Sequence, residues 1–135
     1  MLEQGWGHVY NLEGLGSDGR IVPGTTLYGS SKSAVAYLTR GMAQELPQGD
    51  VRISGLSPGM VITDLLLKGL DHNEIKAKKS RKIFNILADR VETVSPWLVS
   101  QIRANQKNGG TIRWLTTSKI IWRFLKAPFI NRRIV

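Results

Sequence analysis

Three short apolar segments, separated by segments with a helical pattern, constrain the fold of this chain more than any other feature. The apolar segments lie at residues 8–12, 51–56 and 111–115, and turn-forming residues bound them. Between the first two, residues 28–46 carry small or apolar side chains at three- and four-residue spacing, which is typical of a helix that packs on one face. A strand, a helix and a further strand predict a βαβ unit, whose strands are parallel. We therefore expect an α/β fold with about three parallel strands and flanking helices.

The rest of the chain predicts further helices and one charged segment. Helical patterns are expected at residues 63–70, with Thr63 as the N-cap, and at residues 83–88, 93–105 and 118–127. Residues 71–82 carry several Lys and Arg and few apolar side chains, so we expect a mobile or surface segment there.

Composition excludes several classes of site. The chain contains no cysteine, which excludes a disulfide, a thiolate nucleophile and a cysteine-ligated metal. Neither His8 nor His72 has a partner at metal-ligand spacing, so we expect no metal site. No apolar run reaches the roughly 18 residues that span a bilayer. The formal net charge is +9, but no aromatic and basic platform or recognised module accompanies it, so we expect no nucleic-acid partner.

Tyr28 and Lys32 form the first constellation that points to chemistry. Their four-residue spacing puts both side chains on one face of the predicted helix. A nearby cation favours a phenolate, so a Tyr beside a Lys is suited to exchanging protons near neutral pH. Reduction of a carbonyl needs such a group, because the developing alkoxide must receive a proton. A Tyr-x-x-x-Lys pair also arises by chance, so the pair needs support from other segments.

Two further segments accompany this pair. A strand that ends near Asn11 leads into a glycine-rich loop containing Ser17, eleven residues before Tyr28. After the next strand, residues 57–63 spell Ser-Pro-Gly-Met-Val-Ile-Thr. Together with Tyr28 and Lys32, these segments resemble the C-terminal half of the short-chain dehydrogenase/reductase family. The resemblance implies the C-terminal half of a doubly wound Rossmann-type parallel sheet.

The same resemblance implies roles for individual residues. In this family the Tyr exchanges a proton with the substrate oxygen and the Lys binds the nicotinamide ribose, roles that fall on Tyr28 and Lys32. The loop that covers the nicotinamide matches four positions here, which are Pro58, Gly59, Val61 and Thr63. The implied activity is an NAD(P)H-dependent oxidoreductase that reduces a carbonyl, with NADPH as the expected cofactor and NADH as the alternative. The implied partner surface is the helix at 28–46, through which homo- or hetero-oligomers are expected.

A closer resemblance is to the chlorophyll(ide) b reductases. It rests on the glycine-rich stretch after Asn11 and on four further segments, at residues 57–67, 83–87, 91–94 and 110–116. This resemblance implies reduction of the formyl group of a lipophilic pigment, chlorophyll(ide) b, in the chloroplast at the thylakoid. A short-chain reductase that acts on another lipophilic carbonyl is the alternative substrate assignment.

The glycine-rich loop departs from the family pattern at one position. Most members have a Ser three residues after the Asn, where this chain has Gly14. Ser17 is the nearest substitute, and on this interpretation it polarises the carbonyl as a third catalytic residue. The alternative is that Ser17 caps the turn together with Asp18. The sequence leaves both open.

The expected nucleotide-binding half of the family fold has no counterpart in these residues. Gly14, Gly16 and Gly19 do spell Gly-x-Gly-x-x-Gly, but no long helix opens directly after them, so we interpret the match as accidental. The chain is thus expected to be part of a longer enzyme and to be inactive by itself. The alternative is a truncated, non-catalytic chain that acts only by pairing with a full-length partner.

We divide the chain into residues 1–117, a partial short-chain dehydrogenase/reductase domain, and residues 118–135, a basic amphipathic tail. The tail combines five Lys and Arg with Trp122, Phe124, Leu125, Phe129 and Ile130. Such a segment favours peripheral contact with an anionic membrane surface. A solvated charged face is the alternative.

Overall fold

The computed structural model describes residues 1–46, 49–64, 66, 74–130, 132 and 134. Its elements follow one another in the order β1 (Trp6–Leu12), α1 (Thr26–Glu45), β2 (Asp50–Ser57), α3 (Glu74–Leu87), α4 (Val91–Ala104), β3 (Thr111–Arg113) and α5 (Thr117–Lys126). The three strands form one sheet in the order β1-β2-β3, and both pairs are parallel. The predicted α/β fold with three parallel strands is confirmed.

Two compact units make up the described chain. The first consists of residues 1–58 and 101–113 and holds the whole sheet together with α1, and the second consists of residues 59–100 and 114–135 and holds α3 and α5.

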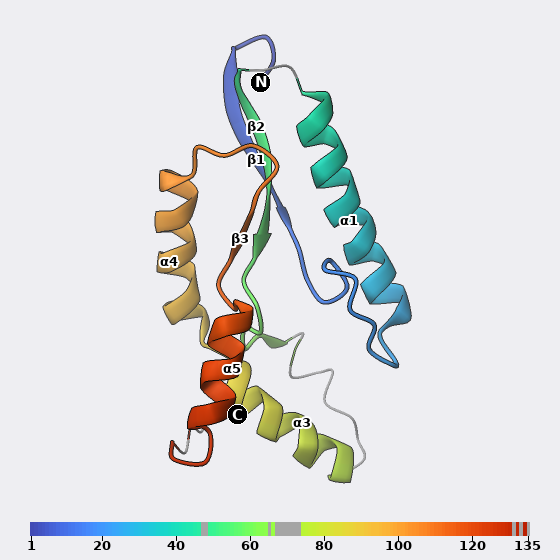
Figure 1. Ribbon diagram of the computed structural model, residues 1–135, viewed down its shortest axis with the longest axis vertical. Helices are drawn as coiled ribbons and strands as arrows, with labels where there is room; N and C mark the ends of the chain where they lie inside the picture. The colour runs from blue at the N-terminus through green and yellow to red at the C-terminus, as the bar shows by residue number, and fades with distance from the viewer. Residues whose placement is uncertain (47–48, 65, 67–73, 131, 133, 135) are drawn as a thin grey trace. The chain divides into compact units, whose positions relative to one another are not determined.

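Helix α1 covers one face of the β1–β2 pair in the first unit, and the two are drawn alongside each other in Figure 1. Ala36 has no exposed surface, and on the facing strand Ile53 is 2% exposed. The Asn11 side-chain amide donates a hydrogen bond of 3.0 Å to the Thr39 hydroxyl, so a polar contact also joins β1 to α1.

The opposite face of the same strands carries a polar network. The His8 Nε2 atom lies 2.9 Å from the Ser54 hydroxyl, and the Tyr10 hydroxyl lies 3.1 Å from His8 Nδ1. The Tyr10 hydroxyl also lies 3.3 Å from the carbonyl oxygen of Ile102, in the last turn of α4. Ser54 is completely buried, and its partners supply the hydrogen bonds that burial requires.

In the second unit, α3 packs against α5. The rings of Trp97 and Trp114 meet edge to face with centroids 5.1 Å apart, and Val94 is 1% exposed. These side chains supply the apolar contacts that hold α4 to the segment leading into α5.

The charged segment at residues 71–82, expected to be mobile or at the surface, is helical from Glu74 onward, and its charge pattern did not indicate this helix. Lys, Glu, Ala and Arg are strong helix formers, and α3 combines them with the apolar turn at residues 83–87. Residues 71–73 lie outside the described residues. So does most of the helix expected at 63–70, although the Thr63 hydroxyl accepts a 3.4 Å hydrogen bond from the Leu66 amide, as an N-cap does.

None of the helices in the described ranges is long and apolar enough to cross a membrane.

Candidate active site

Tyr28 and Lys32 lie one turn apart at the start of α1, close to the carboxyl end of β1. The Lys32 ammonium donates a hydrogen bond of 3.0 Å to the carbonyl oxygen of Leu12, the last residue of β1. Its nitrogen lies 5.8 Å from the centre of the Tyr28 ring. Tyr28 is 46% exposed, so its ring is accessible from solvent. The carboxyl ends of parallel strands are where Rossmann-type folds bind their ligands.

Gly14 lies directly against the Tyr28 hydroxyl. A Cβ atom placed on Gly14 would lie 2.5 Å from that oxygen and 3.3 Å from Cγ of Lys32. The position where most of the resembled family has a Ser therefore holds the phenol end of Tyr28. A side chain at residue 14 would require the Tyr28 hydroxyl to move.

Ser17 is buried and both of its hydrogen-bonding functions have partners. Its hydroxyl accepts a 3.0 Å hydrogen bond from the Gly14 amide and donates one of 3.1 Å to the carbonyl oxygen of Lys32. Asp18 instead accepts hydrogen bonds from the main-chain amide and the guanidinium of Arg20. Ser17 thus ties the loop residue that faces Tyr28 to the helix turn that carries Lys32.

The glycine-rich loop is held to α1 at a second point. The Ser33 hydroxyl donates a 2.7 Å hydrogen bond to the carbonyl oxygen of Gly16. A Cβ on Gly16 would lie 2.6 Å from the Cα atom of Gly29, and Gly16 has a φ of +100°. Both the conformation and the close approach to the helix backbone therefore require glycine. Because α1 begins only at Thr26, the loop does not open directly into a helix.

Glu13 is a member of this site that the sequence analysis did not single out. Its side chain is 3% exposed, accepts a 2.9 Å hydrogen bond from the Thr111 hydroxyl and lies 3.6 Å from the Arg113 guanidinium. Its carboxylate occupies the space where Gly55 of β2 would carry a side chain. In the sequence, the one feature that marks Glu13 is an acidic residue directly after an apolar strand. Glu13 anchors the start of the glycine-rich loop to β3.

The predicted cofactor loop is divided between the two units. Pro58, directly after β2, belongs to the first unit, whereas Gly59, Val61 and Thr63 belong to the second. Gly59 has a φ of +74°, and a Cβ there would lie 2.6 Å from Cβ of Leu115. Val61 forms an isolated parallel bridge with Asp89. Tyr28, Lys32 and Ser17 lie close together in the first unit. Val61 is held by its bridge to Asp89 in the second unit.

The residues of the first unit fit a nicotinamide nucleotide in part. Lys32 presents a cation at the carboxyl end of β1, and its nitrogen lies 5.8 Å from the centre of the half-exposed Tyr28 ring. Among the described residues, no group of three or more acidic or His side chains could hold a metal ion.

Comparison with known proteins gives consistent matches. The family model described as short chain dehydrogenase matches residues 1–74. Chlorophyll(ide) b reductase NOL, chloroplastic, of Arabidopsis thaliana is 40% identical, in an alignment that covers 94% of this chain and 37% of that protein. This chain thus spans little more than a third of the length of that relative.

Two solved structures share the fold at low sequence identity. A 7 alpha-hydroxysteroid dehydrogenase complexed with NADH and 7-oxo glycochenodeoxycholic acid matches with a TM-score of 0.63 and 22% identity, over 85% of this chain and 45% of that one. BdcA in complex with NADPH matches with a TM-score of 0.58 and 21% identity, over 79% of this chain and 43% of that one. Both likenesses place the three-stranded sheet and its helices within a Rossmann-type domain, of which this chain forms a part.

Proposed function

The chain belongs to the short-chain dehydrogenase family, and from that premise we propose that it carries the proton-transfer residues of an NADPH-dependent carbonyl reductase. The observation that supports this most directly is the placement of Tyr28 and Lys32 on one face of α1, at the carboxyl end of β1. A nicotinamide cofactor is in keeping with the family, and the two solved neighbours hold NADH and NADPH.

In the proposed reaction, the carbonyl carbon is reduced and its oxygen takes up a proton. The bound nicotinamide would supply the hydride. The Tyr28 hydroxyl donates its proton to the oxygen as negative charge develops there, and the Lys32 ammonium favours the phenolate that remains. Lys32 also binds the ribose, while Pro58, Gly59, Val61 and Thr63 bind the nicotinamide end.

Ser17 is the third residue of the proposed catalytic set, as a donor to the carbonyl oxygen. Its hydroxyl hydrogen is directed at the carbonyl oxygen of Lys32. A catalytic role therefore requires Ser17 to exchange that partner for the substrate, whereas a purely structural role leaves the bond in place.

For the substrate, we propose the formyl group of chlorophyll(ide) b, on the strength of the 40% identity to the Arabidopsis protein. The name of that relative also supports a chloroplast location, and we propose the thylakoid as the site of action. The alternative substrate is another lipophilic carbonyl compound, and turnover assays with each substrate distinguish the two.

The test is turnover of chlorophyll(ide) b with NADPH by the complete protein, comparing Tyr28→Phe with Tyr37→Phe. Tyr37 lies on the same helix and is 75% exposed, so it is a matched control for loss of a phenol hydroxyl. We expect Tyr28→Phe to lower kcat by roughly a hundredfold or more, since a positioned general acid contributes about 10²–10⁴-fold. Full activity in Tyr28→Phe would remove the proposed mechanism.

A second candidate is a non-catalytic chain that pairs with a full-length partner through α1. The exposed face of this helix supports it, because Leu27, Tyr37, Leu38 and Met42 are all at least 40% exposed. A groove of about 580 Å³ runs beside Tyr37 and Leu38. Nicotinamide nucleotide binding separates the two candidates, since the enzyme requires it and the pairing module does not.

We also propose that α5 and the residues after it contact a membrane surface. Trp122, Leu125 and Phe129 are each more than half exposed, and the Lys126 ammonium lies 4.4 Å from the Trp122 ring centre. Trp122→Glu together with Phe129→Glu should abolish sedimentation with anionic liposomes. Equal sedimentation of wild type and the double variant would contradict this contact.

A further inference from the structure

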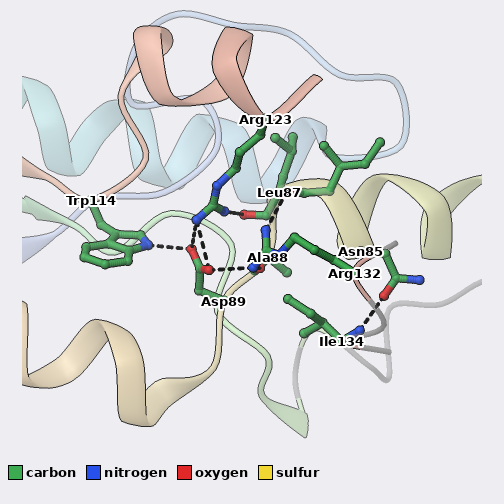
Figure 2. Close-up of polar contacts among 9 residues, drawn as sticks. Asn85, Leu87, Ala88, Asp89, Trp114, Arg123, Arg132 and Ile134 are labelled. Carbon is green, nitrogen blue, oxygen red and sulfur yellow. Dashed lines mark hydrogen bonds and ion pairs between the residues drawn. The ribbon is translucent and has the colours of Figure 1, made fainter. Parts of the chain in front are cut away.

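Asp89 lies at the centre of an ionic cluster in the second unit. The residue is 5% exposed and connects α3 to α4. Its carboxylate accepts a 2.6 Å hydrogen bond from the Trp114 indole and pairs with the guanidinium groups of Arg123 and Arg132 at 2.8 and 2.9 Å. Figure 2 shows these three donors converging on the one carboxylate.

The two arginines also bind the end of α3. Arg123 donates a 2.8 Å hydrogen bond to the carbonyl oxygen of Leu87. Arg132 donates to the carbonyl oxygens of Ile86 and Ala88, at 2.9 and 3.1 Å. The last carbonyl groups of a helix lack partners within the helix, and these guanidinium groups supply them (Figure 2). Arg123 and Arg132, two cations of the basic tail, are therefore anchored within the second unit.

The main chain of Asp89 holds a different segment. Its amide donates a 2.9 Å hydrogen bond to the carbonyl oxygen of Met60, and its carbonyl oxygen accepts one of 3.0 Å from the Ile62 amide. These two bonds make the bridge between Asp89 and Val61. One residue thus joins the C-terminal arginines, through its side chain, to the loop at residues 59–63, through its backbone.

The electrostatics of the cluster agree with a carboxylate that stays ionised. Burial acts to raise the pKa of Asp89, but the hydrogen bond from Trp114 and the hydrogen bonds and charges of the arginines outweigh it and lower that pKa below its usual range. Removing one partner from such a pair leaves a buried charge uncompensated.

We propose that Asp89, Arg123 and Arg132 are positioning residues that fix the loop at residues 59–63 in the conformation that binds the nicotinamide end of the cofactor. We call the contacts of Asp89 with Arg123, Arg132 and the loop at residues 59–63 the clamp. The identity of the ligand rests on the proposed function, and the clamp rests on the structure. It links Arg132, which lies after α5, to the cofactor site through Asp89.

The test uses the complete protein with Arg132→Gln, which removes one guanidinium and leaves Asp89 paired with Arg123. Arg103→Gln is the matched control, because Arg103 is exposed near the end of α4 and loses the same charge. Arg132→Lys keeps the charge but cannot reproduce the fork of hydrogen bonds to Asp89, Ile86 and Ala88. Asp89→Asn is unsuitable as a test, because it would leave two arginines without their anion. A failure of that variant to fold would not distinguish a positioning role from a structural one.

The first measurement is hydrogen exchange of the Ile62 and Asp89 amides without cofactor, relative to the Glu13 amide, which bonds the carbonyl oxygen of Leu56 in the first unit. Arg132→Gln should speed exchange at Ile62 and Asp89 by roughly tenfold or more, with Arg132→Lys in between and Arg103→Gln at the wild-type rate. Unchanged exchange in Arg132→Gln would overturn the clamp.

The second measurement is the KM for NADPH against kcat at saturating NADPH. We expect Arg132→Gln to raise this KM by roughly tenfold while kcat changes less, because a misplaced loop weakens binding before it affects proton transfer at Tyr28. An unchanged KM despite faster exchange would overturn the link to the cofactor. A wild-type protein that binds no NADPH would refute the proposed function, and the exchange measurement would still decide whether the clamp exists.

Discussion

Two glycines of the loop at residues 14–19 differ in what their missing side chain would meet. Gly16 and Gly19 both have positive φ, at +100° and +82°. A Cβ on Gly16 would collide with the backbone of Gly29, whereas a Cβ on Gly19 meets nothing within 4 Å. Alanine substitutions at the two glycines therefore separate two contributions to stability: the strain of a positive φ, present at both, and the clash with α1, present only at Gly16.

We predict that Gly16→Ala lowers the free energy of unfolding by roughly 2–4 kcal/mol, because strain and overpacking add. Gly19→Ala should lower it by about 1 kcal/mol through strain alone. Urea denaturation of the complete protein measures both. Equal losses in the two variants would show that the loop does not press on α1 as described.

Ser17 allows a structural and a catalytic role to be measured separately. Ser17→Ala removes the hydrogen bonds to the Gly14 amide and the Lys32 carbonyl oxygen in a buried position, so stability should fall by about 1–3 kcal/mol. Ser31→Ala is the control, because the Ser31 hydroxyl bonds the carbonyl oxygen of Tyr28 at an exposed position.

The catalytic role adds a second expectation for Ser17→Ala, a fall in kcat beyond that of Ser31→Ala at a temperature where both variants are folded. Turnover equal to that of wild type under those conditions would leave Ser17 with the structural role only.

At the scale of elements, the His8 imidazole of β1 bonds Ser54 of β2 and the Tyr10 hydroxyl. Burial, with a smaller contribution from the charge of Arg52, lowers the pKa of His8 below its usual value of 6.5. The neutral imidazole is therefore the form that the fold favours. Its Nδ1 atom faces the Tyr10 hydroxyl and its Nε2 atom faces Ser54.

Stability should consequently depend on pH through His8. Because the folded pKa is the lower one, the contribution is fully present above the unfolded value of about 6.5 and is lost as the pH falls through 6.5 toward the folded pKa. Between pH 7.5 and 5.5 the wild type should lose stability, and His8→Gln should lose less. Parallel pH profiles of the two proteins, measured as Tm, would contradict this assignment.

At the scale of the whole molecule, the described part of the chain leaves large apolar side chains exposed on both β1 and α1. On β1, Trp6 and Leu12 are 67% and 55% exposed, and α1 adds Tyr37 and Leu38. Within the described residues the sheet is β1-β2-β3, and β1 pairs only with β2. An unpaired strand edge and apolar helix face of this kind favour association.

We predict that this chain, expressed alone, self-associates in a concentration-dependent way. Light scattering after size exclusion should show oligomers, and Tyr37→Lys with Leu38→Lys should reduce them. Val99→Lys on α4, where Val99 is 46% exposed, is the control for adding charge at an apolar surface position. A monomer with a sharp, cooperative melting transition would contradict the prediction.

The sequence determined the elements and the pair at the start of α1. Apolar periodicity predicted all three strands and the long helix, because the spacing of buried side chains is a local property of a strand or a helix. The four-residue spacing of Tyr28 and Lys32 predicted their shared face for the same reason. The charge of residues 74–82 did not indicate their helix, because a surface helix and an unstructured segment share that composition.

Only the tertiary structure decided which distant residues complete these sites. Glu13 meets Thr111 and Arg113, and Asp89 meets Arg123 and Arg132, across separations of about one hundred and about forty residues in the chain. The sequence signals of these residues are single charges without periodicity, and charge alone does not select a partner. Burial does, because a carboxylate removed from water is stable only where the folded chain brings donors to it.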